Sequence, residues 1–213
     1  MVPSDARRLF LLALTAGVLF VPLFILRRIG PFDFWWLMSL DLVLLLFLSS
    51  SSDRRFGRIL LADFRTGLAR KILLGILSAF VLYGFFYVGK ALSGTLLPFA
   101  GEEIQRIYGF RGEASTLRIV LLMLLVIGPG EEIFWRASLQ RLCMDRWGDA
   151  RGWFISVALY SLVHLGSGNL MLVLAAAVCG LFWGWLYRRF RSIILVAVSH
   201  TIWDILVFII APF

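Results

Sequence analysis

Three short motifs place ionisable or polar side chains four residues apart within apolar stretches of this sequence. They are Glu131-Glu132-x-x-x-Arg136, Tyr160-x-x-x-His164 and His200-x-x-x-Asp204, and they include both histidines of the chain. Residues four apart share one face of a helix, so a shared face is expected for Glu132 with Arg136, Tyr160 with His164, and His200 with Asp204. An ionisable side chain near a bilayer centre costs roughly 2.5–3.5 kcal/mol on insertion scales. We therefore expect the three motifs to line one shared polar cavity, since only a shared cavity lowers the cost of all of them at once.

The two adjacent acids of the first motif differ in their surroundings. Glu132 and Arg136 lie on one helix face, so Arg136 can neutralise and orient Glu132 through a charge-assisted hydrogen bond. Glu131 points well away from Arg136 and is free to face the cavity as a base. Pro129 lacks a backbone donor, so we expect a kink or a restarted helix just before the acids. The simpler alternative is a salt bridge that only sets the depth of the helix.

Two chemistries suit such a cavity, and the spacing does not choose between them. In the first, Glu131 and His164 hold a water and Glu131 removes its proton, while His200 and Asp204 bind the oxyanion that develops on an attacked carbonyl. In the second, the histidines and a carboxylate, such as Glu131, His164 and His200, hold a divalent metal that lowers the pKa of its water.

Composition indicates an all-α, polytopic membrane protein. The 213 residues are 61% hydrophobic, with a mean hydropathy of +0.90, far above soluble globular proteins. The net charge of +8 comes from short arginine clusters between apolar runs and makes no continuous basic face, which argues against nucleic acid as a partner.

Apolar runs predict a single transmembrane domain, 1–213, with about seven spans. We place the spans at residues 9–26, 34–48, 72–97, 116–136, 152–165, 169–187 and 192–213. Amphipathic interfacial helices are expected at 53–71 and 137–149, and a mixed-charge loop at 102–118. In the sixth span, Trp183 and Trp185 beside Gly180 and Gly184 indicate helix packing.

Basic residues concentrate at the N-terminus and after the second, fourth and sixth spans, which predicts that these ends, including the N-terminus, are cytoplasmic. Arg27 and Arg28 depart from this pattern. The same rule places Glu131 toward the cytoplasmic end of its span and His164 toward the outer end of the next, so their meeting in one cavity is a specific expectation.

The three motifs, in this order and on successive helices, resemble those of the CPBP family of intramembrane CAAX proteases and bacteriocin-processing or immunity proteins. The resemblance covers residues 116–213, the motif-bearing core, whereas residues 1–115 add spans of the kind that vary within the family. It implies a membrane-embedded endopeptidase in which Glu131 is the base, His164 positions the water and His200 with Asp204 forms the oxyanion site. Glu132, Arg136 and Tyr160 are then supporting residues.

Two motif residues bear on how closely the chain follows the family pattern. Tyr160 stands where the family commonly has phenylalanine and adds a hydroxyl to the cavity. Asp204 can donate to an oxyanion only if protonated; as a carboxylate it would orient His200 or bind a metal.

The resulting functional hypothesis is hydrolysis of a peptide bond in a membrane-anchored or C-terminally processed substrate, within the bilayer of a bacterial inner membrane. We expect no obligatory cofactor, with zinc as the alternative. The other class of function is a non-proteolytic one, either an ion-coupled transporter or a membrane scaffold or immunity protein. Transporters usually have broken helices in both halves, and this sequence shows one broken segment.

Overall fold

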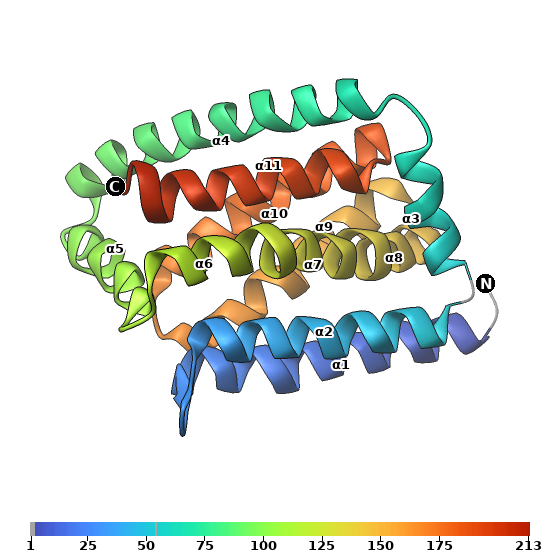
Figure 1. The fold of residues 1–213 in the computed structure, drawn as a ribbon, viewed down its shortest axis with the longest axis horizontal. Helices are drawn as coiled ribbons and strands as arrows, with labels where there is room; N and C mark the ends of the chain where they lie inside the picture. Colours follow the sequence, from blue (N-terminus) through green and yellow to red (C-terminus); the bar gives the residue numbers. More distant parts are fainter. Residues whose placement is uncertain (1–2, 54) are drawn as a thin grey trace.

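The computed structural model describes residues 3–53 and 55–213 and is 87% helical (Figure 1). Within this described part, five helices are long and apolar enough to cross a membrane: Asp5–Leu26, Phe34–Ser52, Leu68–Leu96, Leu170–Phe190 and Ile193–Ile210. The expected all-α membrane fold is therefore confirmed. The predicted span 116–136 lies within a helical run built from several consecutive elements, and the predicted span 152–165 lies within α9 and η4; the count of seven stays a prediction.

The elements follow one another with short connections. In chain order they are α1 (Pro3–Leu26), β1 (Arg28–Ile29), β2 (Phe32–Asp33), α2 (Phe34–Ser52), α3 (Phe56–Phe64), α4 (Leu68–Leu96), α5 (Ala100–Tyr108), η1 (Gly109–Arg111), α6 (Thr116–Leu122), η2 (Met123–Ile127), α7 (Gly128–Glu132), η3 (Ile133–Gln140), α8 (Arg141–Trp147), α9 (Asp149–Val163), η4 (His164–Ser167), α10 (Leu170–Phe190), α11 (Ile193–Ile205) and η5 (Leu206–Ile210). Strands β1 and β2 form a small antiparallel hairpin between the first two helices.

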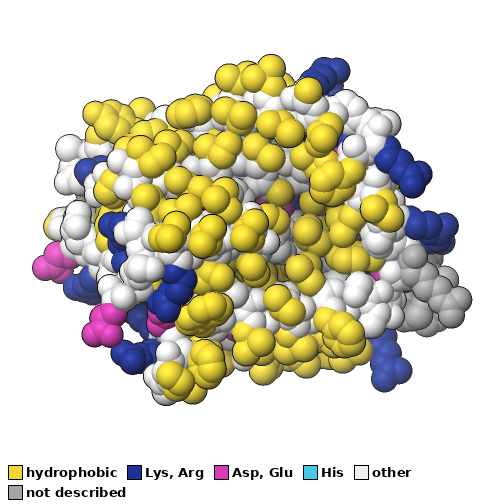
Figure 2. All heavy atoms as spheres, in the orientation of Figure 1, with side chains coloured by type: hydrophobic (Ala, Val, Ile, Leu, Met, Phe, Trp, Pro, Cys, Tyr) yellow, Lys and Arg dark blue, Asp and Glu magenta, His cyan; other side chains and the backbone are white. Residues whose placement is uncertain are grey.

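The outer surface of the bundle is apolar between its two ends. Phe10, Phe47 and Phe85 are each more than 60% exposed, a level that in water would be unfavourable for so many large apolar side chains. Figure 2 shows apolar side chains across the middle of one face and Lys and Arg mainly toward its left and right ends. A lipid-facing belt with charged ends is the pattern of an integral membrane protein.

The segment that carries the acidic motif is a continuous helical run through the interior. It extends from Thr116 to Trp147 and contains two π-helical stretches, η2 and η3, on either side of α7. In η2 the Gly128 N–H donates to the Met123 carbonyl, so the wider turn accommodates Pro129, which has no N–H to give. Of the two expected outcomes at Pro129, a kink or a restart, the restart does not occur, because the helical run is continuous. The segment expected as a separate amphipathic helix at 137–149 continues this run, and its residues Ala137, Leu139 and Cys143 are fully buried.

Three other boundaries differ from expectation. The amphipathic helix expected over 53–71 is only α3, and α4 already begins at Leu68. The serines at 49–52 belong to α2, where several hydroxyls bond to carbonyls three residues earlier. The predicted mixed-charge loop at 102–118 contains α5, whose first turn carries Glu102 and Glu103. Acidic residues favour the N-terminus of a helix, which accounts for α5.

Helix α4 lies at the edge of the bundle, along α11 (Figure 1). Its first half fits closely, since a Cβ on Gly75 would lie 2.8 Å from the Leu195 carbonyl and 2.9 Å from Val198. Gly84 and Gly89, further along, have open space around them. The second half of α4 is therefore free to form a wall of a cavity.

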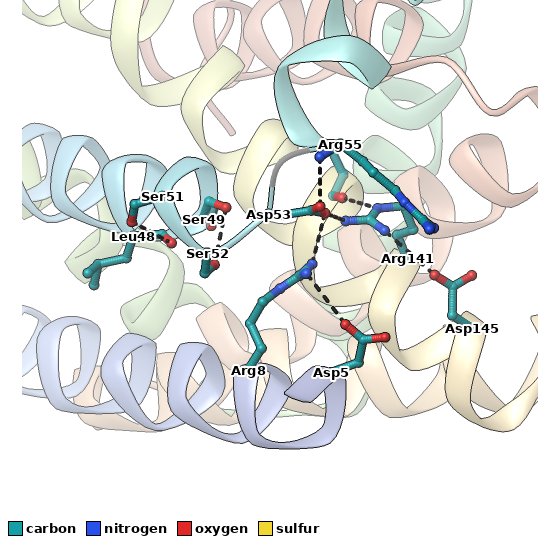
Figure 3. A network of polar contacts seen from close by, with 11 residues as sticks. Asp5, Arg8, Leu48, Ser49, Ser51, Ser52, Asp53, Arg55, Arg141 and Asp145 are labelled. Carbon is teal, nitrogen blue, oxygen red and sulfur yellow. Dashed lines mark hydrogen bonds and ion pairs between the residues drawn. The ribbon is translucent and has the colours of Figure 1, made fainter. Parts of the chain in front are cut away.

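A network of charged side chains connects α1, the start of the α2–α3 connection and α8 to one another (Figure 3). It lies at the end of the bundle where the N-terminus lies (Figure 1). The buried Asp53 carboxylate accepts hydrogen bonds from Arg8 at 3.0 Å, from Arg141 and from the Arg55 backbone at 2.9 Å. Burial raises the pKa of Asp53, but the Arg55 hydrogen bond and the charges of Arg8 and Arg141 outweigh it, so the pKa lies below its usual value.

Candidate active site

A close contact between α7 and α11 brings the acids to the second histidine. A Cβ on Gly128 would collide with the Thr201 hydroxyl, so only glycine permits this approach of the two helices. Thr201 directly follows His200, and Gly128 lies one turn before Glu131 and Glu132. The close approach at Gly128 therefore places both carboxylates beside the His200 imidazole.

His200 is bound at both ring nitrogens. Its Nδ1 lies 2.9 Å from Glu132 Oε1, and its Nε2 lies 3.5 Å from Glu131 Oε2 and 3.4 Å from Asp204 Oδ2. Because Nδ1 faces a carboxylate, that nitrogen carries a proton and donates it to Glu132. Nε2 is left facing two carboxyl groups across the cavity, the arrangement in which a proton can pass between an acid and an imidazole.

Glu132 joins the first and third motifs. Its Oε2 accepts from Arg136 Nε at 3.0 Å, and both side chains are fully buried. The predicted pairing of Glu132 with Arg136 is therefore seen in the structure. The contact of Glu132 with His200 was not predicted, since spacing within one helix carries no information on which distant helix lies opposite.

Tyr160 and His164 approach from α9 and η4. The Tyr160 hydroxyl donates to Glu131 Oε2 at 3.4 Å, and the Arg136 guanidinium lies over the Tyr160 ring at 5.1 Å. His164 Nδ1 is 2.8 Å from the Tyr160 carbonyl oxygen, which can only accept. Nδ1 of His164 therefore holds the proton and Nε2 presents a lone pair, as suits an acceptor for a water hydrogen.

A cavity of about 300 Å³ contains these groups. Glu131, His164, His200 and Asp204 all line its wall, together with Tyr160. Glu132 and Arg136 do not line it and lie behind His200 and Tyr160. Glu131 and His164 can reach the same cavity because Glu131 lies near the middle of the Thr116–Trp147 run rather than at its end.

Trp183 belongs to the site and was predicted only as a packing residue. Its ring lies parallel to the His200 ring, with centroids 3.8 Å apart and an interplanar angle of 20°. Its Nε1–H donates to Ser199 Oγ at 3.2 Å, and Ser199 also accepts from Ser78 of α4 at 2.9 Å. The stack fixes the plane of the imidazole. The small neighbours Gly180 and Gly184 indicated a close contact at this level of the sixth span but not its partner.

The residues proposed for a metal are not arranged as a ligand set. Within the part of the chain that the structure describes, no three His, Cys, Asp or Glu side chains are placed to hold one metal ion. His200 and His164 both use Nδ1 for contacts within the protein, which leaves Nε2 of each ring as the nitrogen that could meet a ligand. Because the side chains are not placed as one ligand set, no catalytic step is assigned to a metal.

Comparison with known proteins supports the resemblance read from the three motifs. Residues 113–206 match the family model described as type II CAAX prenyl endopeptidase Rce1-like. This confirms the expected resemblance for the region that carries all three motifs. No curated protein and no solved structure matches the chain.

Proposed function

We propose that this protein is an intramembrane endopeptidase that hydrolyses a peptide bond of a membrane-anchored substrate with a water activated by Glu131. The observation that carries the proposal is the meeting of Glu131, His164 and His200 on one cavity inside an apolar bundle. The Rce1-like family match over the same residues supports protease chemistry.

The first step is attack by water. Glu131 as a carboxylate takes one proton from a water whose other hydrogen is held by the His164 Nε2 lone pair. The water oxygen forms a bond to the substrate carbonyl carbon, and the carbonyl π electrons move to its oxygen. His200 acts here as the imidazolium, protonated at both nitrogens, and its Nε2–H stabilises the resulting oxyanion. Glu132 holds this ring through Nδ1, and Trp183 stacks on its face.

The second step releases the products. Glu131, now protonated, gives its proton to the leaving nitrogen as the carbon–nitrogen bond breaks and the carbonyl re-forms. Asp204, 3.4 Å from His200 Nε2, orients that imidazole as a carboxylate. Tyr160 donates to Glu131 Oε2, so it sets the direction of the carboxylate. Arg136 neutralises Glu132 and keeps this buried acid charged.

The rest of the cavity is suited to an apolar substrate. Its walls beyond the catalytic groups come mainly from apolar side chains of α4, α5 and α10, such as Phe86, Ile107 and Leu174. Leu174 and Val178 on α10 and Phe85 on α4 are also more than 40% exposed on the lipid-facing surface. We infer that a substrate segment enters from the bilayer between α4 and α10. This route suits a substrate that is itself anchored in lipid.

The proposal is tested by mass spectrometry of protein termini in cells that express the wild-type chain or Glu131→Ala at matched levels. New termini that vanish in the variant establish proteolysis and give the cleavage site. Glu131→Gln is the conservative control, because it keeps the volume and removes only the base. Identical termini in all three samples would direct attention to the transporter or scaffold function instead.

A further inference from the structure

Residues 211–213 follow η5 as a short non-helical segment, and Phe213 lines the cavity. The Tyr83 hydroxyl donates to the Ala211 carbonyl at 2.9 Å, and the Phe213 N–H donates to the Tyr108 hydroxyl at 2.7 Å. The Gln105 amide donates to the Phe213 carbonyl at 3.5 Å. All three contacts are to main-chain atoms, which any residue in the segment could offer.

The Phe213 side chain lies in an aromatic pocket. Its ring stacks on Tyr83 with centroids 5.0 Å apart and an angle of 24°, and it also lies nearly parallel to Phe86 at 6.4 Å. Phe86 in turn contacts Trp203, with ring centroids 4.8 Å apart. Trp203 directly precedes Asp204, so the aromatic pocket is one side chain away from the catalytic groups.

The pocket and the catalytic groups share one cavity. Phe86, Tyr108 and Phe213 line it together with Glu131 and His200. Side chains that bind the main chain of a short segment, beside a pocket for one of its side chains, are the usual parts of a peptide-binding subsite.

We propose that Tyr83, Phe86, Gln105 and Tyr108 form a peptide subsite, which residues 211–213 occupy in this conformation and a substrate occupies in their place. The bound stretch is short and non-helical and carries an aromatic or large apolar side chain at the position of Phe213. Calling that ligand a substrate rests on the proposed function; the binding site itself does not. Residues 211–213 then act as a tethered competitor, and a ligand must displace them, which lowers its apparent affinity.

The test measures binding without turnover. A fluorescein-labelled peptide containing Ala-Pro-Phe is titrated against the Glu131→Ala protein in lipid nanodiscs, and anisotropy reports the dissociation constant. Adding Phe213→Ala removes the competitor's ring, and we expect the peptide to bind about 3- to 10-fold more tightly, the factor expected for loss of one aromatic pair. Phe190→Ala, which truncates another phenylalanine outside the cavity, is the matched control and should leave the affinity unchanged.

Unchanged or weaker binding in Phe213→Ala would overturn the proposal, because residues 211–213 would then be only part of the wall. Should that variant fail to fold, a peptide with a photoreactive benzophenone in place of its phenylalanine is cross-linked to the Glu131→Ala protein. Cross-links within 83–86 or 105–108 support the subsite, and cross-links confined to other segments refute it. Since neither readout requires cleavage, the inference can fail or stand independently of the protease assignment.

Discussion

Replacing Gly128 with alanine tests how closely the contact between α7 and α11 controls the active site. The added Cβ would collide with the Thr201 hydroxyl and would lie only 3.0 Å from Thr201 Cβ and from the Met123 carbonyl. Carbon atoms in contact prefer about 3.5–4.0 Å, so the helices must separate by roughly 0.5–1 Å even without the hydroxyl. Overpacking of this kind costs about 1–3 kcal/mol of stability.

The same separation acts on the catalytic geometry. It moves Glu131 and Glu132 away from His200, whose contacts with them are 3.5 and 2.9 Å. A displacement of about 1 Å can cost 100-fold in rate, so we expect kcat to fall roughly 100-fold. The Michaelis constant should change much less, because the apolar walls of the cavity on α4 and α5 are not displaced.

The assay measures steady-state cleavage of a reporter substrate by purified protein in lipid nanodiscs. The reporter contains the cleavage site found by mass spectrometry of protein termini. Gly130→Ala is the matched control, since its Cβ would lie 3.5 Å from Leu42, an ordinary contact. The double variant Gly128→Ala with Thr201→Ala removes the collision with the hydroxyl but keeps the 3.0 Å approaches to the residue 201 Cβ and the Met123 carbonyl, so it should recover only part of the lost rate. Full activity in Gly128→Ala, or equal losses in Gly128→Ala and Gly130→Ala, would refute the assignment of Gly128 as the residue that sets this distance.

Three further predictions concern other parts of the molecule. Trp183→Leu removes the ring stacked on His200 and should lower kcat about 10- to 100-fold with little effect on the Michaelis constant. Trp183→Phe keeps an aromatic ring and should retain most activity. Equal kinetics in the two variants would show that the stacked ring has no part in catalysis. Asp53→Asn breaks contacts with Arg8 and Arg141 and should cost about 1.5–3 kcal/mol of stability, seen as a lower Tm in thermal unfolding. Because the pKa of Asp53 in the folded protein lies below its ordinary value of 3.8, Asp53 stabilises the fold above that pH, and this stabilisation is lost as the pH falls through the folded pKa. The wild-type protein should therefore lose more stability on acidification than Asp53→Asn. Identical profiles of stability against pH for the two proteins would contradict this. Finally, we expect cleavage to persist in strong chelator, because the proposed mechanism activates its water with Glu131 and needs no metal. Activity lost in chelator and restored by zinc would favour the metal alternative.

Several features of the site could be predicted from local spacing alone. Glu132 and Arg136 are four residues apart in a helical run, and they form an ion pair. Tyr160 in α9 and His164 at the start of η4 both line the cavity, and so do His200 and Asp204 in α11. Such contacts depend only on the geometry of one helix, which is the same wherever the helix lies.

Predictions that depended on hydropathy or on single residues were less accurate. Pro129 suggested a kinked or restarted helix, but the helical run continues through it, with π-helical stretches on either side of α7. Neither the proline itself nor the hydropathy of its neighbours indicates which backbone hydrogen bonds form around it. The 137–149 segment was predicted to be interfacial from its charges, yet its first residues are fully buried. Arg141, one of those charged residues, is largely buried against Asp53, a partner far away in sequence.

By itself the sequence determined that this is an all-α membrane protein, that three helical motifs place ionisable residues within its apolar stretches, and that these motifs resemble a family of intramembrane proteases. Only the tertiary structure decided which side chains from different helices meet: Glu132 with His200, Tyr160 with Glu131, Trp183 on His200, and residues 211–213 with α4 and α5. The physical reason is that helix formation follows local periodicity, whereas the rotation and depth of each helix depend on close packing against its neighbours. Here that packing is set at points such as Gly128 against Thr201 and Gly75 against α11.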